Sequence, residues 1–184
     1  MFACEHELVQ PDIYVFAKGL TGGYLPLAIT LVSREVFSPF ANGTDAATTL
    51  SYGHSYTGNA LACAAARASL DIFRSENVLA SLPAKSRLIR EGLSALADLE
   101  GVEEVRSIGM IGAIDLTDAV SASNVCWQAR GYGLLTRPIR NTIVLMPPLC
   151  ITAEQLDIAL SALKQAIQSV ITLKQKNSQM VAKV

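Results

Sequence analysis

The chain has 184 residues, of which 51% are apolar and 17% are charged, and its formal net charge is −1. This length fits one domain or slightly more, and the apolar content excludes a disordered chain. The charge balance excludes a nucleic-acid-binding protein that relies on net basicity. The low charge content indicates that some apolar surface meets a partner, as in an oligomer subunit.

Targeting and metal-binding signals are missing from the sequence. The charge-free stretches 19–33 and 46–66 contain glycine, proline or polar residues, so neither predicts a membrane-spanning helix. The first residues show no basic region followed by an apolar one, so no signal peptide is predicted. The four cysteines form no CxxC pair, and the chain has only two histidines, which predicts no zinc site and reduced, mostly buried thiols. We therefore expect a cytoplasmic protein.

Apolar runs predict two strands and two helices in the first part of the chain. Residues 13–17 and 27–32 are short apolar runs, which are typical of buried strands. Ser33 is a candidate N-cap for a short helix, and Asn59 is a candidate N-cap for an alanine-rich helix over 58–73. Two strands and two helices are too few to cover both faces of a parallel sheet. The first part of the chain is therefore predicted to be an incomplete piece of an α/β sheet.

The composition changes after residue 75, and the second part of the chain predicts a compact α+β unit. Pro83 lies near the start of the first helix predicted in this part, where the helix either tolerates the proline or breaks at it. Thr152 is the candidate N-cap of its last helix. In chain order the predicted elements are a helix over 77–99, an antiparallel strand pair over 102–106 and 110–116, a helix over 122–130 ended by Gly131, strands over 134–137 and 142–146 around a turn at 138–141, and a helix over 153–173.

Lys18 stands at the end of the first predicted strand and is followed by the glycine-rich segment GLTGG. Poor solvation at such a position disfavours the ammonium and leaves a neutral amine that attacks carbonyl groups. The glycines allow a bulky planar cofactor to approach the backbone. The alternative is an ordinary lysine whose stem packs beside a turn.

Residues 52–59, with the sequence YGHSYTGN, directly precede the alanine-rich helix. Hydroxyl groups and free backbone N–H groups at a helix N-terminus favour an anion such as a phosphate. The alternative is a simple helix cap within a loop. His54 could act as a base, but no serine or aspartate stands at a spacing that supports a catalytic triad.

Arg137 is the third candidate, because it precedes Pro138 and the apolar segment that ends in LMPP. A guanidinium group binds a carboxylate through two parallel hydrogen bonds, and the proline would hold the arginine stiffly. A surface ion pair is the alternative.

The order of these motifs resembles one family. The stretches KGLTGGYLPLA, GHSYTGNALACAAA, VRSIGMIGAIDL and GLLTRPIRNTIVLMPPLCIT are similar to the fold-type I, class III pyridoxal-phosphate aminotransferases, and the likeness covers almost the whole chain. The last stretch favours the biotin-biosynthesis branch over the ornithine, 4-aminobutyrate and other ω-amino acid branches. The resemblance implies an α/β fold in which residues 1–75 are the C-terminal part of the large cofactor-binding domain and residues 76–184 are the complete small α+β domain.

The resemblance implies a role for each candidate residue. Lys18 would bond covalently to pyridoxal 5′-phosphate and move a proton between substrate and cofactor. Ser55 would hold the cofactor phosphate with His54 beside it, and Gly53 would line the substrate pocket. In this family the loop reaches the partner subunit's cofactor in a homodimer. Arg137 would bind the carboxylate of a 7-oxo acid, which receives its amino group from a small-molecule donor, either S-adenosylmethionine or lysine.

The resemblance also implies that essential groups lie outside this sequence. The family's aspartate at the pyridine nitrogen, its backbone phosphate cup and the aromatic residue on the cofactor ring have no counterpart here. We therefore expect a C-terminal portion that is inactive without its N-terminal half. The alternatives are another class III specificity and a non-catalytic fragment. We expect neither nucleic acid nor a membrane as a partner.

Overall fold

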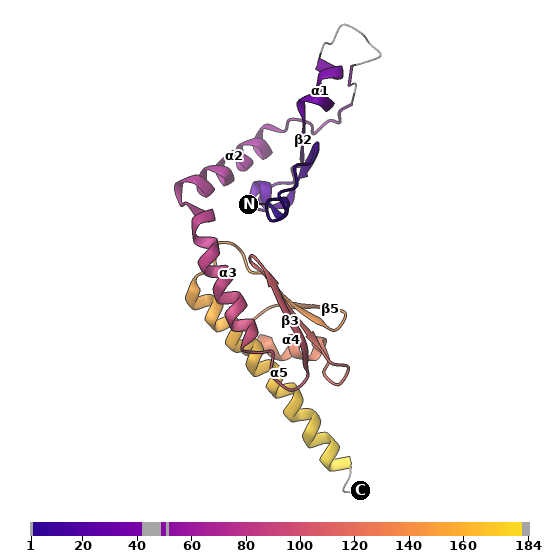
Figure 1. Ribbon diagram of the computed structural model, residues 1–184, viewed down its shortest axis with the longest axis vertical. Helices are drawn as coiled ribbons and strands as arrows, with labels where there is room; N and C mark the ends of the chain where they lie inside the picture. Colours follow the sequence, from indigo (N-terminus) through magenta and orange to yellow (C-terminus); the bar gives the residue numbers. More distant parts are fainter. Residues whose placement is uncertain (1, 42–48, 51, 182–184) are drawn as a thin grey trace. The chain divides into compact units, whose positions relative to one another are not determined.

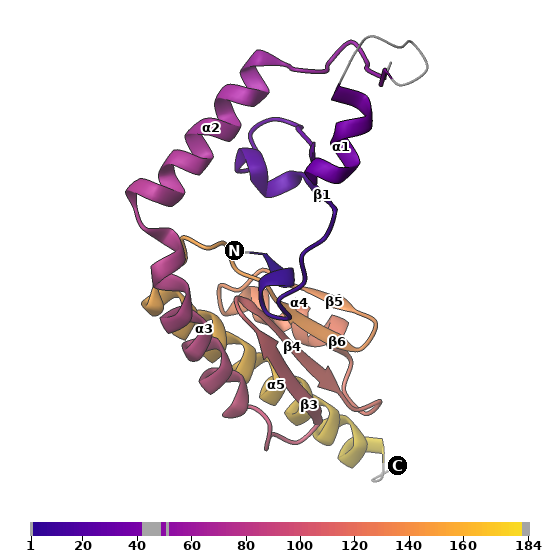
Figure 2. The same cartoon turned by 45° about the horizontal axis from the view of Figure 1, so that its top comes forward.

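The computed structural model describes residues 2–41, 49–50 and 52–181, and the chain divides into two compact units, Met1–Leu79 and Ala80–Val184 (Figures 1 and 2). We call them unit 1 and unit 2. The division lies within the first turn of α3 (Val78–Ser94), whereas the sequence analysis placed the domain boundary after residue 75.

The described residues of unit 1 form a two-stranded antiparallel sheet, two short 3-10 helices and two α-helices. The predicted helix N-caps are confirmed, because the Val36 N–H donates to Ser33 Oγ (3.4 Å) and the Ala62 N–H donates to Asn59 Oδ1 (3.0 Å). In chain order the elements are η1 (Ala3–Glu5), β1 (Ile13–Phe16), η2 (Lys18–Thr21), β2 (Ile29–Val32), α1 (Arg34–Ala41) and α2 (Ala60–Ser75).

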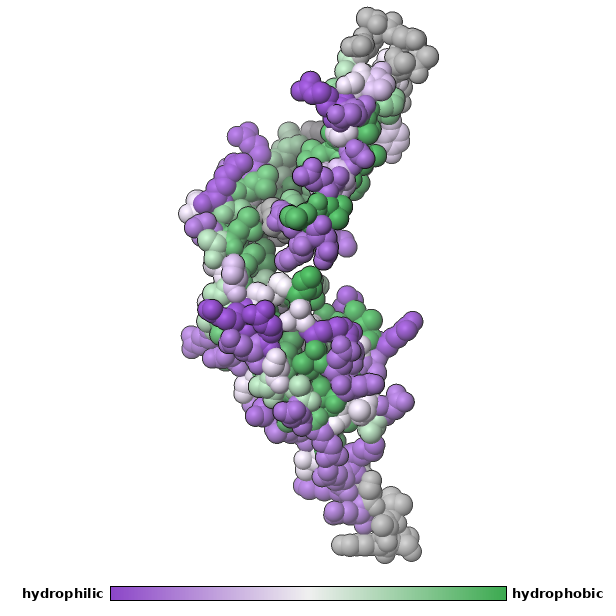
Figure 3. Space-filling model, viewed as in Figure 1, coloured by the Kyte–Doolittle hydropathy of each residue, from purple (hydrophilic) through white to green (hydrophobic). Residues whose placement is uncertain are grey.

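The strands of unit 1 are not buried, contrary to the sequence prediction. Ile13 and Val15 of β1 are 52% and 70% exposed, and hydrophobic side chains lie at the surface of this unit (Figure 3). The only buried side chains among its described residues are those of Thr21, Ala62 and Ala66. Two strands with one long helix supply too little apolar area to cover both faces of a sheet, so the apolar residues remain in contact with solvent.

Unit 2 is an antiparallel sheet packed against helices, as predicted. The sheet has the order β3-β4-β6-β5, and the strands β3 and β4 form the predicted pair, with Ile108 opposite Ile111. Beyond α3, the elements are β3 (Val102–Ile108), β4 (Ile111–Leu116), α4 (Ala122–Gly131), β5 (Arg137–Ile139), β6 (Thr142–Leu145) and α5 (Ala153–Val181).

The core of unit 2 lies between one face of the sheet and the helices. Ile114 of β4 and Ile143 of β6 are fully buried and belong to the same apolar cluster as Ile89 of α3, Val125 of α4 and Leu163 of α5. At the start of α5, Thr152 and Gln155 cap each other, because each backbone N–H donates to the other's side chain at 3.1 Å or less. The predicted N-cap at Thr152 is therefore confirmed.

The opposite face of this sheet carries a polar cluster. Arg106 of β3 and Thr142 of β6 both donate hydrogen bonds to the carboxylate of Asp115 in β4. The guanidinium of Arg106 and then the hydroxyl of Thr142 hold the pKa of Asp115 below its ordinary value. Cross-strand pairing of these groups adds a charge-assisted link between three strands.

Several details of unit 2 differ from the sequence predictions. Pro138 lies inside β5 and not in the turn, which an edge strand allows because one side of its backbone needs no partner in the sheet. The turn is tighter, with Arg140 in the left-handed region at φ 56°. The helix α4 ends at Gly131, as predicted, and Gly133 then adopts the left-handed conformation with φ 84°. In contrast, Pro83 lies within α3, which agrees with the predicted alternative in which the helix tolerates it.

The cysteine side chains are less buried than the sequence predicted. Cys63 and Cys150 are exposed and only Cys126 is buried, so the prediction of mostly buried thiols was wrong, although all four thiols are free. Burial raises the pKa of the Cys126 thiol.

By length and composition, Ala153–Lys176 of α5 could cross a membrane, the one such helix in the described part of the chain. Its buried residues, including Leu163, account for this apolar character because they belong to the core of unit 2.

Candidate active site

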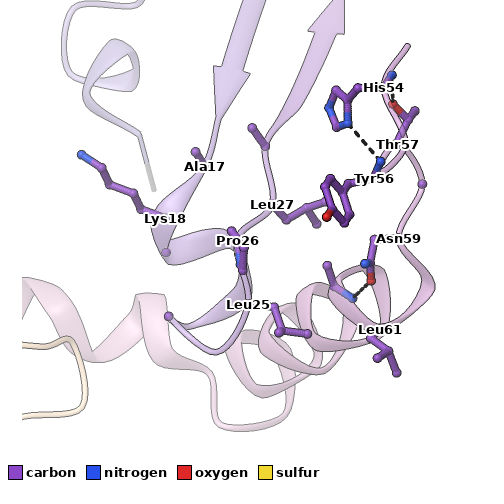
Figure 4. A pocket seen from close by; sticks show the side chains of 15 residues that line it. Ala17, Lys18, Leu25, Pro26, Leu27, His54, Tyr56, Thr57, Asn59 and Leu61 are labelled. Carbon is purple, nitrogen blue, oxygen red and sulfur yellow. Dashed lines mark hydrogen bonds between the residues drawn. The ribbon is translucent and has the colours of Figure 1, made fainter.

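Lys18 lies where β1 ends and η2 begins, as the sequence predicted. Its backbone adopts φ 49°, in the left-handed region that costs a residue with a Cβ about 1–2 kcal/mol. Such conformations are concentrated at functional sites. The side chain is exposed and extends away from Tyr56 and Asn59 (Figure 4), so the predicted poor solvation of its amine is wrong for this chain. The described residues around it are too sparse to remove it from water.

The glycine-rich segment after Lys18 folds back on α2. Gly22 ends η2 with φ 62°, and Gly23 follows with φ 84°, so both positions require a residue without a Cβ. The Thr21 hydroxyl donates to the Leu25 carbonyl (2.5 Å) and is almost fully buried. Alanines on the facing side of α2, Ala62 among them, let the helix approach η2 closely. The segment is thereby held at a fixed place beside the helix N-terminus.

Residues 52–59 form an exposed loop that is tied together by its own hydrogen bonds. The His54 N–H donates to Thr57 Oγ1 (3.0 Å), and the Tyr56 N–H donates to Nδ1 of His54 (3.2 Å). Asn59 then caps α2. Sequence reasoning identified the loop but missed the roles of Thr57 and Tyr56. The hydroxyl residue three positions after His54 is the signal that could have pointed to Thr57.

One cavity of about 1220 Å³ connects the lysine segment with this loop. Lys18, Pro26 and Leu27 line it from one side, and His54 and Asn59 line it from the other (Figure 4). The structure therefore brings two of the predicted site residues, Lys18 and His54, to one cavity within unit 1. Ser55 and Gly53 belong to the same loop but are not among the residues that line this cavity.

Arg137 lies in unit 2, at the first position of β5. It is exposed and stands opposite Val144 of β6. The adjacent Thr136 hydroxyl donates to the Val144 carbonyl (2.5 Å), which fixes the strand at this point. Within the described residues Arg137 forms no ion pair, so the alternative of a surface ion pair is not what the structure shows. Its guanidinium is free to bind an anion.

No cluster of potential metal ligands occurs among the described residues. The candidate functional groups are the primary amine of Lys18, the hydrogen-bond donors of the loop 52–59 and, in unit 2, the guanidinium of Arg137. A family model described as aminotransferase class-III matches residues 1–167 of this chain.

The chain belongs to the class III aminotransferase family.

Similar proteins agree with this assignment. An adenosylmethionine-8-amino-7-oxononanoate aminotransferase of Geobacter sulfurreducens is 41% identical over 181 residues, which are 92% of this chain and 40% of that protein. The enzyme of the same name from Aquifex aeolicus is 37% identical over 179 residues, 91% of this chain and 40% of that protein. The chain spans about 40% of the length of these class III aminotransferases.

Solved structures show that the fold is shared as well. The crystal structure of adenosylmethionine-8-amino-7-oxononanoate aminotransferase from Methanocaldococcus jannaschii superposes with a TM-score of 0.84 at 37% identity, over 92% of this chain and 42% of that one. The omega transaminase from Pseudomonas jessenii in complex with PMP gives a TM-score of 0.86 at 25% identity, over 95% of this chain and 41% of that one. The predicted α/β fold of a fold-type I transferase is thus confirmed for this class III chain.

Class III aminotransferases depend on pyridoxal 5′-phosphate, and the residues present fit parts of that cofactor. A lysine amine fits the aldehyde, because the two condense readily. The N–H and hydroxyl of Ser55 have no partner among the described residues, and such free donors beside a helix N-terminus fit the phosphate. The left-handed glycines after Lys18 leave room for a planar ring near the backbone.

Proposed function

We propose that this chain is the C-terminal portion of an aminotransferase that aminates 8-amino-7-oxononanoate in biotin biosynthesis. The observation that carries the proposal is the identity of about 40% to relatives named for this reaction, over more than 90% of the chain. The arrangement of Lys18 and the loop around one cavity supports it. Because the chain spans about 40% of its relatives, the complete activity needs the portion that it does not span.

The proposed roles follow from the chemistry of each side chain. Pyridoxal phosphate supplies an electron sink when it is bound. Lys18 binds the cofactor through its amine and moves a proton at the substrate carbon that carries the amino group. Its position directly after β1 sets the point on the backbone from which the amine reaches that carbon.

The loop residues bind and orient. Ser55 donates hydrogen bonds to the cofactor phosphate, His54 stands beside it, and Gly53 leaves space for substrate. A homodimer in which the loop serves the partner subunit's cofactor remains part of the proposal. Arg137 orients the oxo acid by binding its carboxylate through two parallel hydrogen bonds.

The proposal is tested by supplying the portion that the chain does not span. The chain is mixed with the unmatched portion of the Geobacter sulfurreducens relative and pyridoxal phosphate, then reduced with borohydride and digested. Mass spectrometry is expected to find the cofactor on Lys18 in preference to the other five lysines. Lys18→Ala should abolish this label, and Lys164→Ala, a change in an exposed lysine of α5, should leave it in place. Equal labelling of all lysines would refute the role of Lys18.

Substrate choice needs a separate measurement. Amination of 8-amino-7-oxononanoate is compared with that of four- and five-carbon oxo acids, with S-adenosylmethionine and with lysine as donors. The proposal expects the long oxo acid to react fastest. Faster reaction of a short oxo acid would assign the chain to another class III specificity, for which the likeness to an omega transaminase is the supporting observation.

A further inference from the structure

The two peptide groups that flank Ser55 are each held by a hydrogen bond. On its N-terminal side the His54 carbonyl accepts from the Thr57 N–H (2.9 Å), and on its C-terminal side the Tyr56 N–H donates to Nδ1 of His54 (3.2 Å). Two further bonds close the loop, because the His54 N–H donates to Thr57 Oγ1 (3.0 Å) and the Tyr56 carbonyl accepts from the Asn59 N–H (3.2 Å).

Ser55 itself keeps its donors unused. Its side chain is exposed, and neither its N–H nor its hydroxyl has a partner among the described residues. The loop is therefore ordered by the neighbours of Ser55, while Ser55 presents two donors in a direction that the neighbours fix. An anion that binds such donors does not have to order them first, which lowers the entropic cost of binding.

We propose that Thr57 and His54 are positioning residues that pre-organise Ser55 for the phosphate of the cofactor. This inference rests on the proposed function, which assigns Ser55 to that phosphate. Thr57 acts through its hydroxyl, which accepts from the His54 N–H, and His54 acts through Nδ1, which accepts from the Tyr56 N–H. Neither residue needs to touch the phosphate.

The geometry fixes the form of the histidine. Since Nδ1 accepts a hydrogen bond, the ring must be neutral with its proton on Nε2. The other titratable side chains that line the same cavity are Lys18 and Tyr56, and the Tyr56 ring lies 6.5 Å from the His54 ring. The arrangement of Ser55 therefore depends on the hydrogen bond that His54 Nδ1 accepts from the Tyr56 N–H.

The hydrogen bonds are tested by nuclear magnetic resonance on the full chain without cofactor. The chain has only two histidines, so the exposed His6 serves as an internal reference for the ring nitrogens of His54. At a pH where both rings are neutral, His54 is expected to show one tautomer with the proton on Nε2. Thr57→Val should move it toward the tautomer mixture of His6, whereas Thr57→Ser should not. Thr172→Val, at an exposed position of α5, is the matched control and should change nothing.

Two results would overturn the positioning role in this experiment. One is a wild-type His54 with the same tautomer mixture as His6, and the other is an identical effect of the valine and serine substitutions. Both results are independent of any assumption about the cofactor.

Cofactor affinity is measured next, by titrating pyridoxal phosphate into the enzyme assembled from this chain and the unmatched portion of its relative. Thr57→Val is expected to raise the dissociation constant about fivefold, the factor that corresponds to about 1 kcal/mol for one net hydrogen bond. Thr57→Ser should restore the affinity. Unchanged affinity in Thr57→Val with weakened affinity in Ser55→Ala would overturn the positioning role alone. Unchanged affinity in Ser55→Ala would overturn the phosphate assignment in the proposed function.

Discussion

Replacing Gly92 of α3 with alanine would place a methyl group against Leu160 of α5. A Cβ at residue 92 would lie 2.9 Å from Leu160 Cδ2 and 3.0 Å from Cγ, with Cδ1 closer still. These distances are shorter than carbon–carbon contacts at optimal separation, about 3.5–4.0 Å. Leu160 is only 8% exposed, and rotating its methyl groups does not move Cγ away. Either the leucine or the two helices must therefore shift.

The net effect is the difference between two opposing contributions. Alanine favours the helix over glycine by about 1 kcal/mol. Overpacking of a close-packed core costs about 1–3 kcal/mol, and contact with three atoms of Leu160 places this case in the upper part of that range. We therefore expect Gly92→Ala to lower the free energy of unfolding by about 1–2 kcal/mol, which lowers the melting temperature of unit 2 by roughly 4 °C or more.

The assay is thermal and urea unfolding of the full chain, followed by far-ultraviolet circular dichroism. Gly131→Ala is the matched control, because Gly131 is the last residue of α4 and a Cβ there has no neighbour within 4 Å. That variant should be as stable as the wild type or more stable by up to about 0.5 kcal/mol. If both alanine variants gain stability, the close approach of α3 and α5 at Gly92 is wrong.

Three further expectations concern unit 2. Because the pKa of Asp115 is lowered by Arg106, its contribution to stability is present above the unfolded-state pKa and is lost as the pH falls through the folded-state value. Urea unfolding of wild type and Asp115→Asn should thus differ at neutral pH and converge in acid; a constant gap would contradict this. Thr152→Ala should cost about 1 kcal/mol by removing the cap of α5, while Thr152→Ser should cost less than half of that, as calorimetry can show. Arg137→Lys should raise KM for the long oxo acid in the assembled enzyme, since lysine lacks the planar fork, and an unchanged KM would remove Arg137 from the substrate site.

Local signals in the sequence were sufficient for most elements. Ser33, Asn59 and Thr152 each predicted a helix start that the structure confirms, because a capping side chain acts on backbone groups only two or three residues away. The antiparallel pair of β3 and β4 was predicted in the same way, from two apolar runs around one turn. Pro138 misled the assignment of β5, since proline marks a turn unless the strand happens to lie at a sheet edge.

The candidate site was predicted less completely. The positions of Lys18 and His54 at one cavity agree with the motifs, but the solvation of Lys18 depends on what covers it, and no local pattern encodes that. The same reason explains the exposed strands of unit 1. The hydrogen bond from His54 to Thr57 requires a specific loop geometry, which the sequence suggests only through the spacing of the two residues. The functional roles of Lys18, His54, Ser55, Gly53 and Arg137 all remain predictions.

The two-stranded sheet of unit 1 has a consequence for how this chain behaves in a cell. Within the described residues each strand has one unpaired edge, and apolar side chains such as Ile13, Val15 and Leu31 are exposed along them. An open edge with apolar side chains pairs with whatever strand it meets first, including another copy of the same chain. Strand pairing that completes this sheet therefore competes with aggregation. Self-association of this chain through these edges is therefore expected to increase with protein concentration.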